Sequence, residues 1–303
     1  MKYHPRPKWL LLLTTLLIAS QMAIGGDLKG LKKRVAVMDF DDRAGYGHNV
    51  GRGISDMLVT SLVQTGKFIV IEREQLDEIL KEQSLGASGV VTPQSAAQIG
   101  KVLGVELMVT GSVTEFGEKK ESIGGRFGGI GGKLTTREAR SVVDIRIVDT
   151  ETAEILLSET AEGDEKSRGL DQVAFSDIDF RNPTSWDKTI LGKAARQSVE
   201  KCVEAIDKAM KNVRWQGKII KANDDGTVYM KPGSEGGVQP GMEFVVWSKG
   251  EELIDPDTGI SLGSEEAKIG RIKVVQDIGD GKACKAIVVS GAGFNTGDFV
   301  RQP

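Results

Sequence analysis

The stretch Lys67–Thr114, which reads KFIVIEREQLDEILKEQSLGASGVVTPQSAAQIGKVLGVELMVTGSVT, decides the fold of this chain. It opens with a continuous apolar run at residues 68–71, which is typical of a buried strand. A helix is predicted over residues 74–83, and a second helix begins near Pro93 with apolar residues at helical spacing. Residues 106–116 return to a strand. Strands that alternate with helices in this way predict an α/β layer, in which helices pack on a sheet.

The residues before this stretch extend the same layer. Residues 33–40 alternate between apolar and polar side chains and predict a buried strand. After the polar loop 41–50, an amphipathic helix is predicted from an apolar residue at every fourth position, namely Val50, Ile54, Leu58 and Leu62. The strands on either side of this helix are expected to form a right-handed crossover.

Two polar excursions follow residue 116. The first, residues 118–133, is rich in glycine and leads into a long strand with one apolar face, formed by Ala139, Val143, Ile145 and Ile147. Residues 154–160 are predicted to return beside that strand as part of a meander. The second excursion, residues 162–186, is expected to be irregular. A long helix follows, with Ser185 or Asp187 as its cap and an apolar stripe from Leu191 to Val213.

The composition becomes all-β from Trp215 onward, where short apolar strands alternate with turns rich in glycine, proline and aspartate. This pattern predicts a small barrel of the SH3-like or OB-like size class. The predicted architecture is therefore an α/β (α+β) core domain over residues 31–213 with two β-hairpin excursions. A small all-β barrel domain over residues 214–303 follows it.

The opening stretch resembles the core of the curli-production assembly/transport family, called the CsgG family. The likeness extends from about residue 33 to about residue 213, and its order and spacing together carry it. The matching residues are Phe68, Val70, Glu72, Arg73, Leu76, Ile79, Leu80, Glu82, Gln83, Ile99, Gly100, Leu103, Gly104, Val105, Thr110, Gly111 and Ser112. In the predicted barrel, the runs GSEGGVQPGMEFVVW and DPDTGISLGSE are similar to the C-terminal domain of the flagellar assembly protein FlgT, a periplasmic ring component.

The resemblance to the CsgG family implies a bacterial cell-envelope protein. The best-known member forms a ring-shaped outer-membrane channel that exports amyloid-forming subunits. By this resemblance we expect a homo-oligomeric ring, unfolded secreted polypeptides as substrates and accessory secretion factors as partners. The alternative is a soluble periplasmic assembly or regulatory scaffold without a pore, because the same core occurs in lipoprotein activators of cell-wall synthesis.

Channel members contribute two hairpins per subunit to one shared membrane barrel, because lipid does not tolerate open sheet edges. The two excursions stand where those hairpins leave the core. The first resembles the first hairpin of the family, and the residues that would form the membrane hairpin are Ile123, Phe127, Ile130, Val143 and Ile145. The second fits less well, because charged residues crowd residues 164–168. Both excursions could instead be soluble hairpins or loops that touch neighbouring subunits.

The loop 41–50 corresponds by position to the pore constriction of the family. The resemblance assigns Tyr46, His48 and Asn49 to that constriction, where rings of side chains at a narrow point select what passes. The alternative is a polar surface loop between a strand and a helix.

The N-terminus predicts an export signal over residues 1–25. Lys2, Arg6 and Lys8 precede the apolar run 9–19, and Ala23-Ile24-Gly25 offers a cleavage site. An uncleaved membrane anchor is the alternative. The lipoprotein members of the family carry a cysteine after the signal, and this region has none, so we expect a periplasmic or outer-membrane protein without an N-terminal lipid.

The residue inventory argues against other classes of function. The formal net charge of −3 lacks the basic excess of a nucleic-acid-binding protein. Outside the signal the only histidine is His48, and the only cysteines are Cys202 and Cys284, so no metal site, cofactor site or catalytic group is predicted. We expect a protein that is not an enzyme. Cys202 lies in an apolar helical pattern and is predicted to be a buried free thiol, whereas its pairing with Cys284 stays open.

Overall fold

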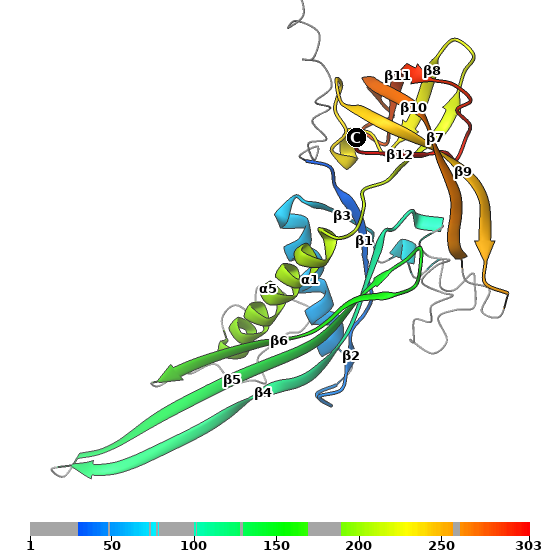
Figure 1. The fold of residues 1–303 in the computed structure, drawn as a ribbon. Helices are drawn as coiled ribbons and strands as arrows, with labels where there is room; N and C mark the ends of the chain where they lie inside the picture. The colour runs from blue at the N-terminus through cyan, green and yellow to red at the C-terminus, as the bar shows by residue number, and fades with distance from the viewer. Residues whose placement is uncertain are drawn as a thin grey trace, which may run out of the picture.

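The structure is a computed structural model that describes residues 30–47, 49–72, 74–76, 78, 100, 102–127, 130–168, 189–256 and 261–303. Within these ranges, the side chains at 123–127, 130–134, 168, 252 and 261 lie outside the description. A mixed sheet with two long helices forms a central body. A closed barrel lies at one end of this body, and a long hairpin extends from the other end (Figure 1).

The body is built on one sheet with the strand order β3-β1-β4-β5-β6, in which the short β2 also pairs with β4. The central strand β1 runs parallel to both β3 and β4, whereas β4, β5 and β6 form an antiparallel meander. The elements of the body are β1 (Lys33–Val37), β2 (Asp41–Asp42), α1 (Val50–Thr65), β3 (Phe68–Val70), β4 (Leu107–Phe127), β5 (Ile130–Asp149), β6 (Ile155–Arg168) and α5 (Ile190–Met210).

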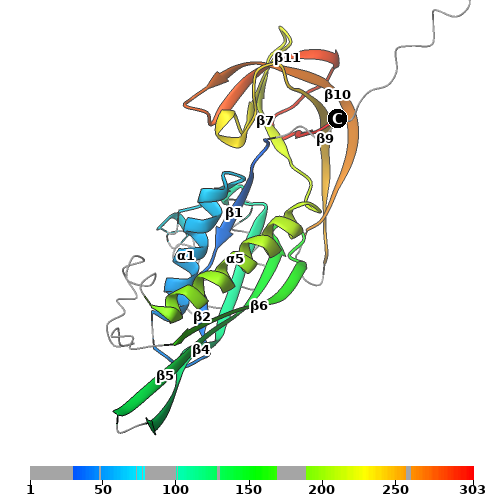
Figure 2. The ribbon, with the colours of Figure 1, turned by 90° about the vertical axis from the view of Figure 1, so that its left-hand side faces the viewer.

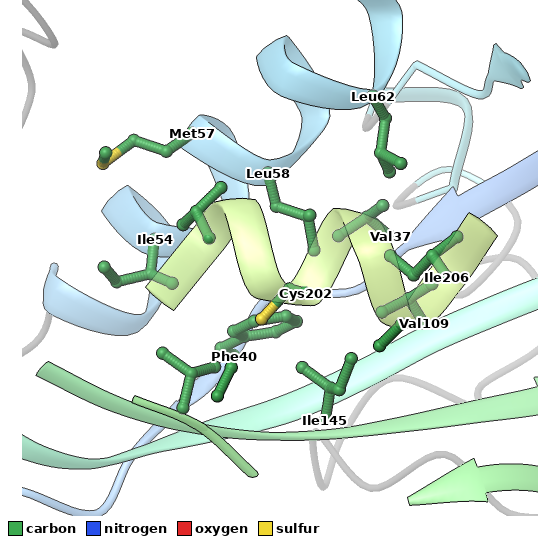
Figure 3. Close-up of a cluster of buried hydrophobic side chains, with 14 of the residues drawn as sticks. Val37, Phe40, Ile54, Met57, Leu58, Leu62, Val109, Ile145, Cys202 and Ile206 are labelled. Atoms are coloured by element: carbon green, nitrogen blue, oxygen red, sulfur yellow. The ribbon is translucent and has the colours of Figure 1, made fainter. Parts of the chain in front are cut away.

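Both helices pack on one face of the sheet, with α5 along β5 and β6 (Figure 2). The predicted apolar stripe of α1 is confirmed, because Val50, Ile54, Leu58 and Leu62 are all buried. Figure 3 shows Ile54 and Leu58 of α1 beside Phe40, Cys202 and Ile206, above the side chains of the sheet. Burial of these side chains supplies the main driving force for folding of the body.

The two central strands are buried on both faces, which explains their nearly continuous apolar sequence. Val35 and Val37 of β1 point toward the helices, whereas Ala36 points to the opposite side. There Ala36 and Met108 join Ile71, Leu76 and Val105 in a second, smaller cluster. Of the predicted helices after β3, the described residues give only helical positions at 74–76, 78, 100, 102 and 103.

The two predicted excursions differ in outcome. The first forms a hairpin as expected, because residues 118–127 continue β4, which pairs with β5 as far as Phe127 opposite Ile130. The return strand is not limited to residues 154–160, because β6 runs to Arg168. The expectation of irregular chain was therefore wrong for residues 162–168, and residues 169–186 lie outside the description.

The reason for this difference is the side-chain chemistry of β6. Its inward positions carry small residues: Ala161 is buried, and a Cβ at Gly163 would lie 1.9 Å from the carbonyl oxygen of Ala194 in α5. Its outward positions are charged because they pair across the sheet surface, as Lys166 does with Glu138 at 2.7 Å. A strand with small inward residues and charged outward residues lacks the apolar alternation that identifies strands in sequence.

The start of α5 also differs from the prediction. Ser185 and Asp187, the two predicted caps, lie outside the described residues, and the cap is Thr189. The hydroxyl of Thr189 accepts a hydrogen bond from the amide of Gly192 at 2.9 Å. This bond satisfies one of the amides that a helix start leaves without an intrahelical partner.

The C-terminal part forms the predicted barrel, which is closed in the order β10-β11-β8-β7-β12-β9. Its core includes Trp215, which stacks on Phe244 with ring centroids 5.2 Å apart, and Cys284. Cys202 and Cys284 are both free and buried, so the prediction for Cys202 is confirmed. The elements are β7 (Gly217–Ala222), β8 (Thr227–Lys231), η2 (Ser234–Gly236), β9 (Glu243–Ile254), β10 (Ser261–Ile278), β11 (Ala283–Gly291) and β12 (Phe299–Arg301).

Several contacts join the barrel to the body. Leu31, which precedes β1, packs against the barrel core, and the amide of Lys32 donates to the carbonyl of Gly236 at 2.9 Å. At the same junction, the carboxyl of Glu106 accepts hydrogen bonds from the backbone amides of Arg34 in β1 and Gln216 before β7. One carboxyl group therefore bridges the two parts of the chain.

Candidate functional site

The sheet of the body has strands that extend well past the hydrophobic core, and this extension is the most distinctive feature of the fold. The last apolar core residues on β4, β5 and β6 are Phe116, Ala139 and Ala161. Beyond them β6 pairs with β5 as far as Thr136, and past that point β4 and β5 run on as a two-stranded hairpin with no described helix beside its outer part (Figures 1 and 2). We call the part of this hairpin from residue 117 to residue 138 the long hairpin.

The predicted constriction loop lies at the base of the long hairpin. The carboxylate of Asp42 shapes the loop, because it accepts hydrogen bonds from the amides of Gly45 at 2.9 Å and Gly47 at 2.7 Å. Tyr46 is 50% exposed, and its ring packs edge-on against Phe116 of β4 at a centroid distance of 5.9 Å. A Cβ at position 117 would lie 2.4 Å from the Tyr46 hydroxyl, so Gly117 makes room for this ring.

The other two predicted loop residues take different positions. Asn49 is the N-cap residue of α1, without a side-chain capping bond, and its carbonyl accepts from the amide of Gly53 at 2.8 Å. His48 lies outside the described residues. The structure thus brings Tyr46 to the base of the hairpin and places Asn49 at the start of the next helix. Phe116 was not identified from the sequence, although a glycine inside a strand, such as Gly117, can mark the close approach of another group.

The five residues predicted for the membrane hairpin divide into two groups. Val143 and Ile145 are fully buried in the body, where they anchor β5 under the helices. Ile123, Phe127 and Ile130 belong to the outer ladder, in which Ile123 pairs with Leu134 and Phe127 with Ile130. The side chains of this second group lie outside the description. A contact with lipid can therefore involve only the outer group.

The outward face of the hairpin base is highly charged. The guanidinium of Arg140 on β5 forms ion pairs with Glu115 on β4 at 2.7 Å and with Glu162 and Asp164 on β6 at 3.0 and 3.1 Å. The hydrogen bonds to Glu115 and Asp164 raise the pKa of Arg140 further above its ordinary value. Beside this group, Thr160 donates to Asp144 at 2.6 Å. Cross-strand pairs of this kind hold the three strands in register.

Polar residues also occupy the first part of the long hairpin. Lys119, Lys120, Glu121 and Ser122 are all exposed, so both faces of β4 are polar there. Beyond Ser122, five residues remain on β4 (123–127), and five residues of β5 (130–134) pair with them. At a rise of about 3.3 Å per residue they reach about 17 Å, which is less than the apolar band of about 25 Å in outer-membrane barrels.

β6 is one of the two edge strands of the sheet, and β3 is the other. β6 pairs with β5 on one side, and no other described strand pairs with its outer side. An unpaired edge of this length can hydrogen-bond to another chain.

Among the helices that the structure describes, none combines the length and hydrophobicity that a membrane crossing requires.

Known proteins share parts of this chain. A family model described as "Curli production assembly/transport component CsgG" matches residues 24–232. A protein of Neisseria meningitidis serogroup B with the name "Putative lipoprotein" is 29% identical over 198 residues, which cover 62% of this chain and 80% of that protein. The curli component CsgG of Escherichia coli K12 is 30% identical over 115 residues, which cover 36% of this chain and 42% of the length of that relative.

Among solved structures, a hypothetical protein from Chlamydia trachomatis has a TM-score of 0.43 at 14% identity. That match covers 60% of this chain and 99% of the other.

Proposed function

Because the chain belongs to the CsgG family, we propose that it is a cell-envelope protein that forms a homo-oligomeric ring and supports the transport of secreted polypeptides across the outer membrane. The observation that carries this proposal is the continuation of the body sheet into the long hairpin, with the exposed Tyr46 at its base. The proposal includes no catalytic step. The sheet edges would bind neighbouring subunits, and the Tyr46 loop would contact the transported polypeptide.

Ring assembly follows from the edges of the sheet. The outer edge of β6 offers backbone groups to a neighbouring subunit, and a hairpin that approaches lipid needs neighbours to satisfy its own edges. When one patch of a subunit binds a different patch on the next, and the rotation closes, the product is a ring. In this arrangement the long hairpins of all subunits would lie side by side on one side of the ring and face the outer membrane.

The lumen would be lined by the loop at the hairpin base. Tyr46 is fixed by its contact with Phe116 but keeps half of its surface exposed, as a residue that meets a passing chain requires. Tyr46, His48 and Asn49 of all subunits would then form rings at a narrow point and select an unfolded polypeptide by size and polarity. Accessory secretion factors would bind the rim of this ring.

A second candidate is a soluble periplasmic assembly or regulatory scaffold that forms no pore. The polar stretch Lys119–Ser122 favours it, because the outer ladder beyond this stretch is shorter than a membrane span. In this candidate the hairpins touch neighbours or the membrane surface. An export signal over residues 1–25 and the absence of an N-terminal lipid belong to both candidates, and both remain predictions.

The two candidates differ in two measurements. We expect negative-stain images of the purified protein to show rings with a stained centre, and we expect the protein to stay with outer-membrane fragments after osmotic shock. Rings that are released by osmotic shock would support the scaffold. Uniformly small particles at every concentration would contradict ring assembly in either form. An unrelated periplasmic protein expressed in the same cells is the control for complete release.

A further inference from the structure

Beyond the barrel, β9 and β10 continue as a two-stranded ribbon. β12 pairs with β9 only at Val245–Trp247, and β11 pairs with β10 only from Gly270 onward. Beyond these pairings β9 and β10 pair with each other and with no other described strand, and we call the described residues 250–256 and 261–265 of this ribbon the arm. Gly250 allows the two strands to approach closely, because a Cβ there would lie 2.4 Å from the carbonyl oxygen of Glu265.

The arm has an unusual surface for a ribbon in water. Three large aliphatic side chains are exposed at its outer part: Leu253 at 56%, Ile254 at 48% and Leu262 at 66%. Glu251 and Glu265 flank them, and the sequence has no lysine or arginine from Gly250 to Ala267. A two-stranded ribbon is only marginally stable by itself, and an exposed aliphatic cluster with a charged rim is typical of a protein-binding surface.

A cleft that is lined mainly by positive charges and apolar side chains lies between the barrel and the ends of α1 and α5. Its volume is about 620 Å³, and Leu31, Phe68, Val213 and Trp215 supply its apolar lining. Four cations line it against the single carboxylate of Asp207. These cations are Lys33, Lys67, Lys211 and Arg214.

Two of the four cations are already engaged. The ammonium group of Lys33 donates to the carbonyls of Met210 and Val213 at the end of α5, and Lys67 forms an ion pair with Asp207 at 2.9 Å. Lys211 and Arg214 are exposed and form no ion pair with any described residue. They therefore give the mouth of the cleft a net positive charge that the fold itself does not neutralise.

We propose that the arm of one subunit docks in the cleft of a neighbouring copy of this chain. Leu253 would enter the apolar lining, and Ile254, which points to the other face of the ribbon, would stay outside it. Glu251 and Glu265 would face Lys211 and Arg214. In Figure 1 the ends of α1 and α5, which border the cleft, lie on one side of β1, and the outer ends of β9 and β10 lie on the other, so we expect the arm to dock on another copy. Arm and cleft are different patches, so their contact is heterologous and propagates from copy to copy until the ring closes. This inference rests on the proposed ring and adds the surfaces that build it.

Charge exchange tests this contact directly. The arm variant E251K/E265K and the cleft variant K211E/R214E should each weaken self-association at least tenfold in sedimentation velocity at low salt. An equimolar mixture of the two variants should recover assembly, because every contact between unlike copies again joins opposite charges. The control variant E200K/E204K makes the same change in net charge as the arm variant at exposed positions of α5 and should assemble like the wild type.

Disulfide cross-linking locates the contact. The native thiols of Cys202 and Cys284 are buried, so cysteines introduced as L253C and V213C should pair with each other on oxidation and give covalent oligomers. A disulfide within one copy, or no disulfide in assembled protein, would overturn the docking. Assembly that is unchanged in both charge variants would overturn it as well, while the ring itself would stand. A wild type that stays monomeric at all concentrations would overturn both the docking and the proposed function.

Discussion

At the scale of single residues, Glu106 joins the two parts of the chain. Its carboxyl accepts backbone hydrogen bonds from Arg34 and Gln216, which belong to the body and to the start of the barrel. Burial raises the pKa of this carboxyl to about 7, although both hydrogen bonds and the nearby charges of Lys33 and Arg34 act in the opposite direction. Desolvation therefore outweighs the favourable contacts of the charged form.

The raised pKa of Glu106 predicts a dependence of stability on pH. Between the ordinary pKa of 4.5 and the folded pKa of about 7, the folded state holds a proton that the unfolded state has lost. Stability should therefore fall as pH rises through this window, by about 3 kcal/mol from this group. The variant E106Q should lack this component and be more stable than the wild type at pH 8. Thermal unfolding at pH 5, 6, 7 and 8 checks this, and parallel pH profiles would contradict it.

Gly163 controls how closely β6 approaches α5. A Cβ at this position would lie 1.9 Å from the carbonyl oxygen of Ala194 and 2.8 Å from the amide nitrogen of Ser198, so the helix would have to move. We expect G163A to lower the free energy of unfolding by about 1 to 3 kcal/mol. Urea titration measures this loss. The control S158A, at an exposed position of the same strand, should change it little, and equal effects of both variants would refute the packing argument.

Sequence patterns identify buried residues better than they identify contacts. The stripe of α1 and the burial of Cys202 follow from spacing alone, because periodic burial leaves periodic apolar residues. The packing of Tyr46 on Phe116 could not be predicted in the same way. It joins residues that are distant in sequence and depends on the space that Gly117 leaves for the ring.

At the scale of elements, the three strands of the meander differ in how well their sequences predict them. The apolar face of β5 is confirmed, since Ala139, Val143, Ile145 and Ile147 are all buried. The outer half of β6 was expected to be irregular because its charged residues suggest a loop. Those charges are stabilised by partners on neighbouring elements, such as Arg140 and Glu138 on β5 and Lys193 on α5, and a strand defined by its neighbours cannot be identified from its own residues.

The long hairpin can be shortened without loss of the body. Lys119 and Glu138 pair across the ladder, so an Asn-Gly turn in place of residues 120–137 would close the hairpin there. The core residues Phe116 and Ala139 remain, and we expect the melting temperature to stay within about 3 °C of the wild type. Binding to liposomes of outer-membrane lipid, measured by flotation, should be lost. Undiminished flotation of the shortened protein would assign the membrane contact to another element.

At the scale of the whole molecule, the body and the barrel have separate cores. Among the described residues, no buried side chain belongs to both large clusters, and Leu31 and Glu106 contribute contacts at the junction. Units with separate cores and a small interface should unfold in separate steps.

Matched core substitutions test this independence. Ile145 of the body and Ile272 of the barrel are both fully buried, and replacement of either by alanine should cost about 2 to 5 kcal/mol. In differential scanning calorimetry, I145A should shift only the transition of the body and I272A only that of the barrel. A single transition that moves equally in both variants would show that the two parts unfold as one unit.

The opposite placement of the long hairpin and the barrel gives each subunit a direction (Figure 1). A ring of identical subunits in one orientation then has two unlike faces, one formed by hairpins and the other by barrels. If the hairpins meet the outer membrane, the barrels face the interior of the cell. A polypeptide on its way out would encounter the barrels first, pass the tyrosine loops second and leave between the hairpins, so the order of these contacts is fixed by the architecture of one chain.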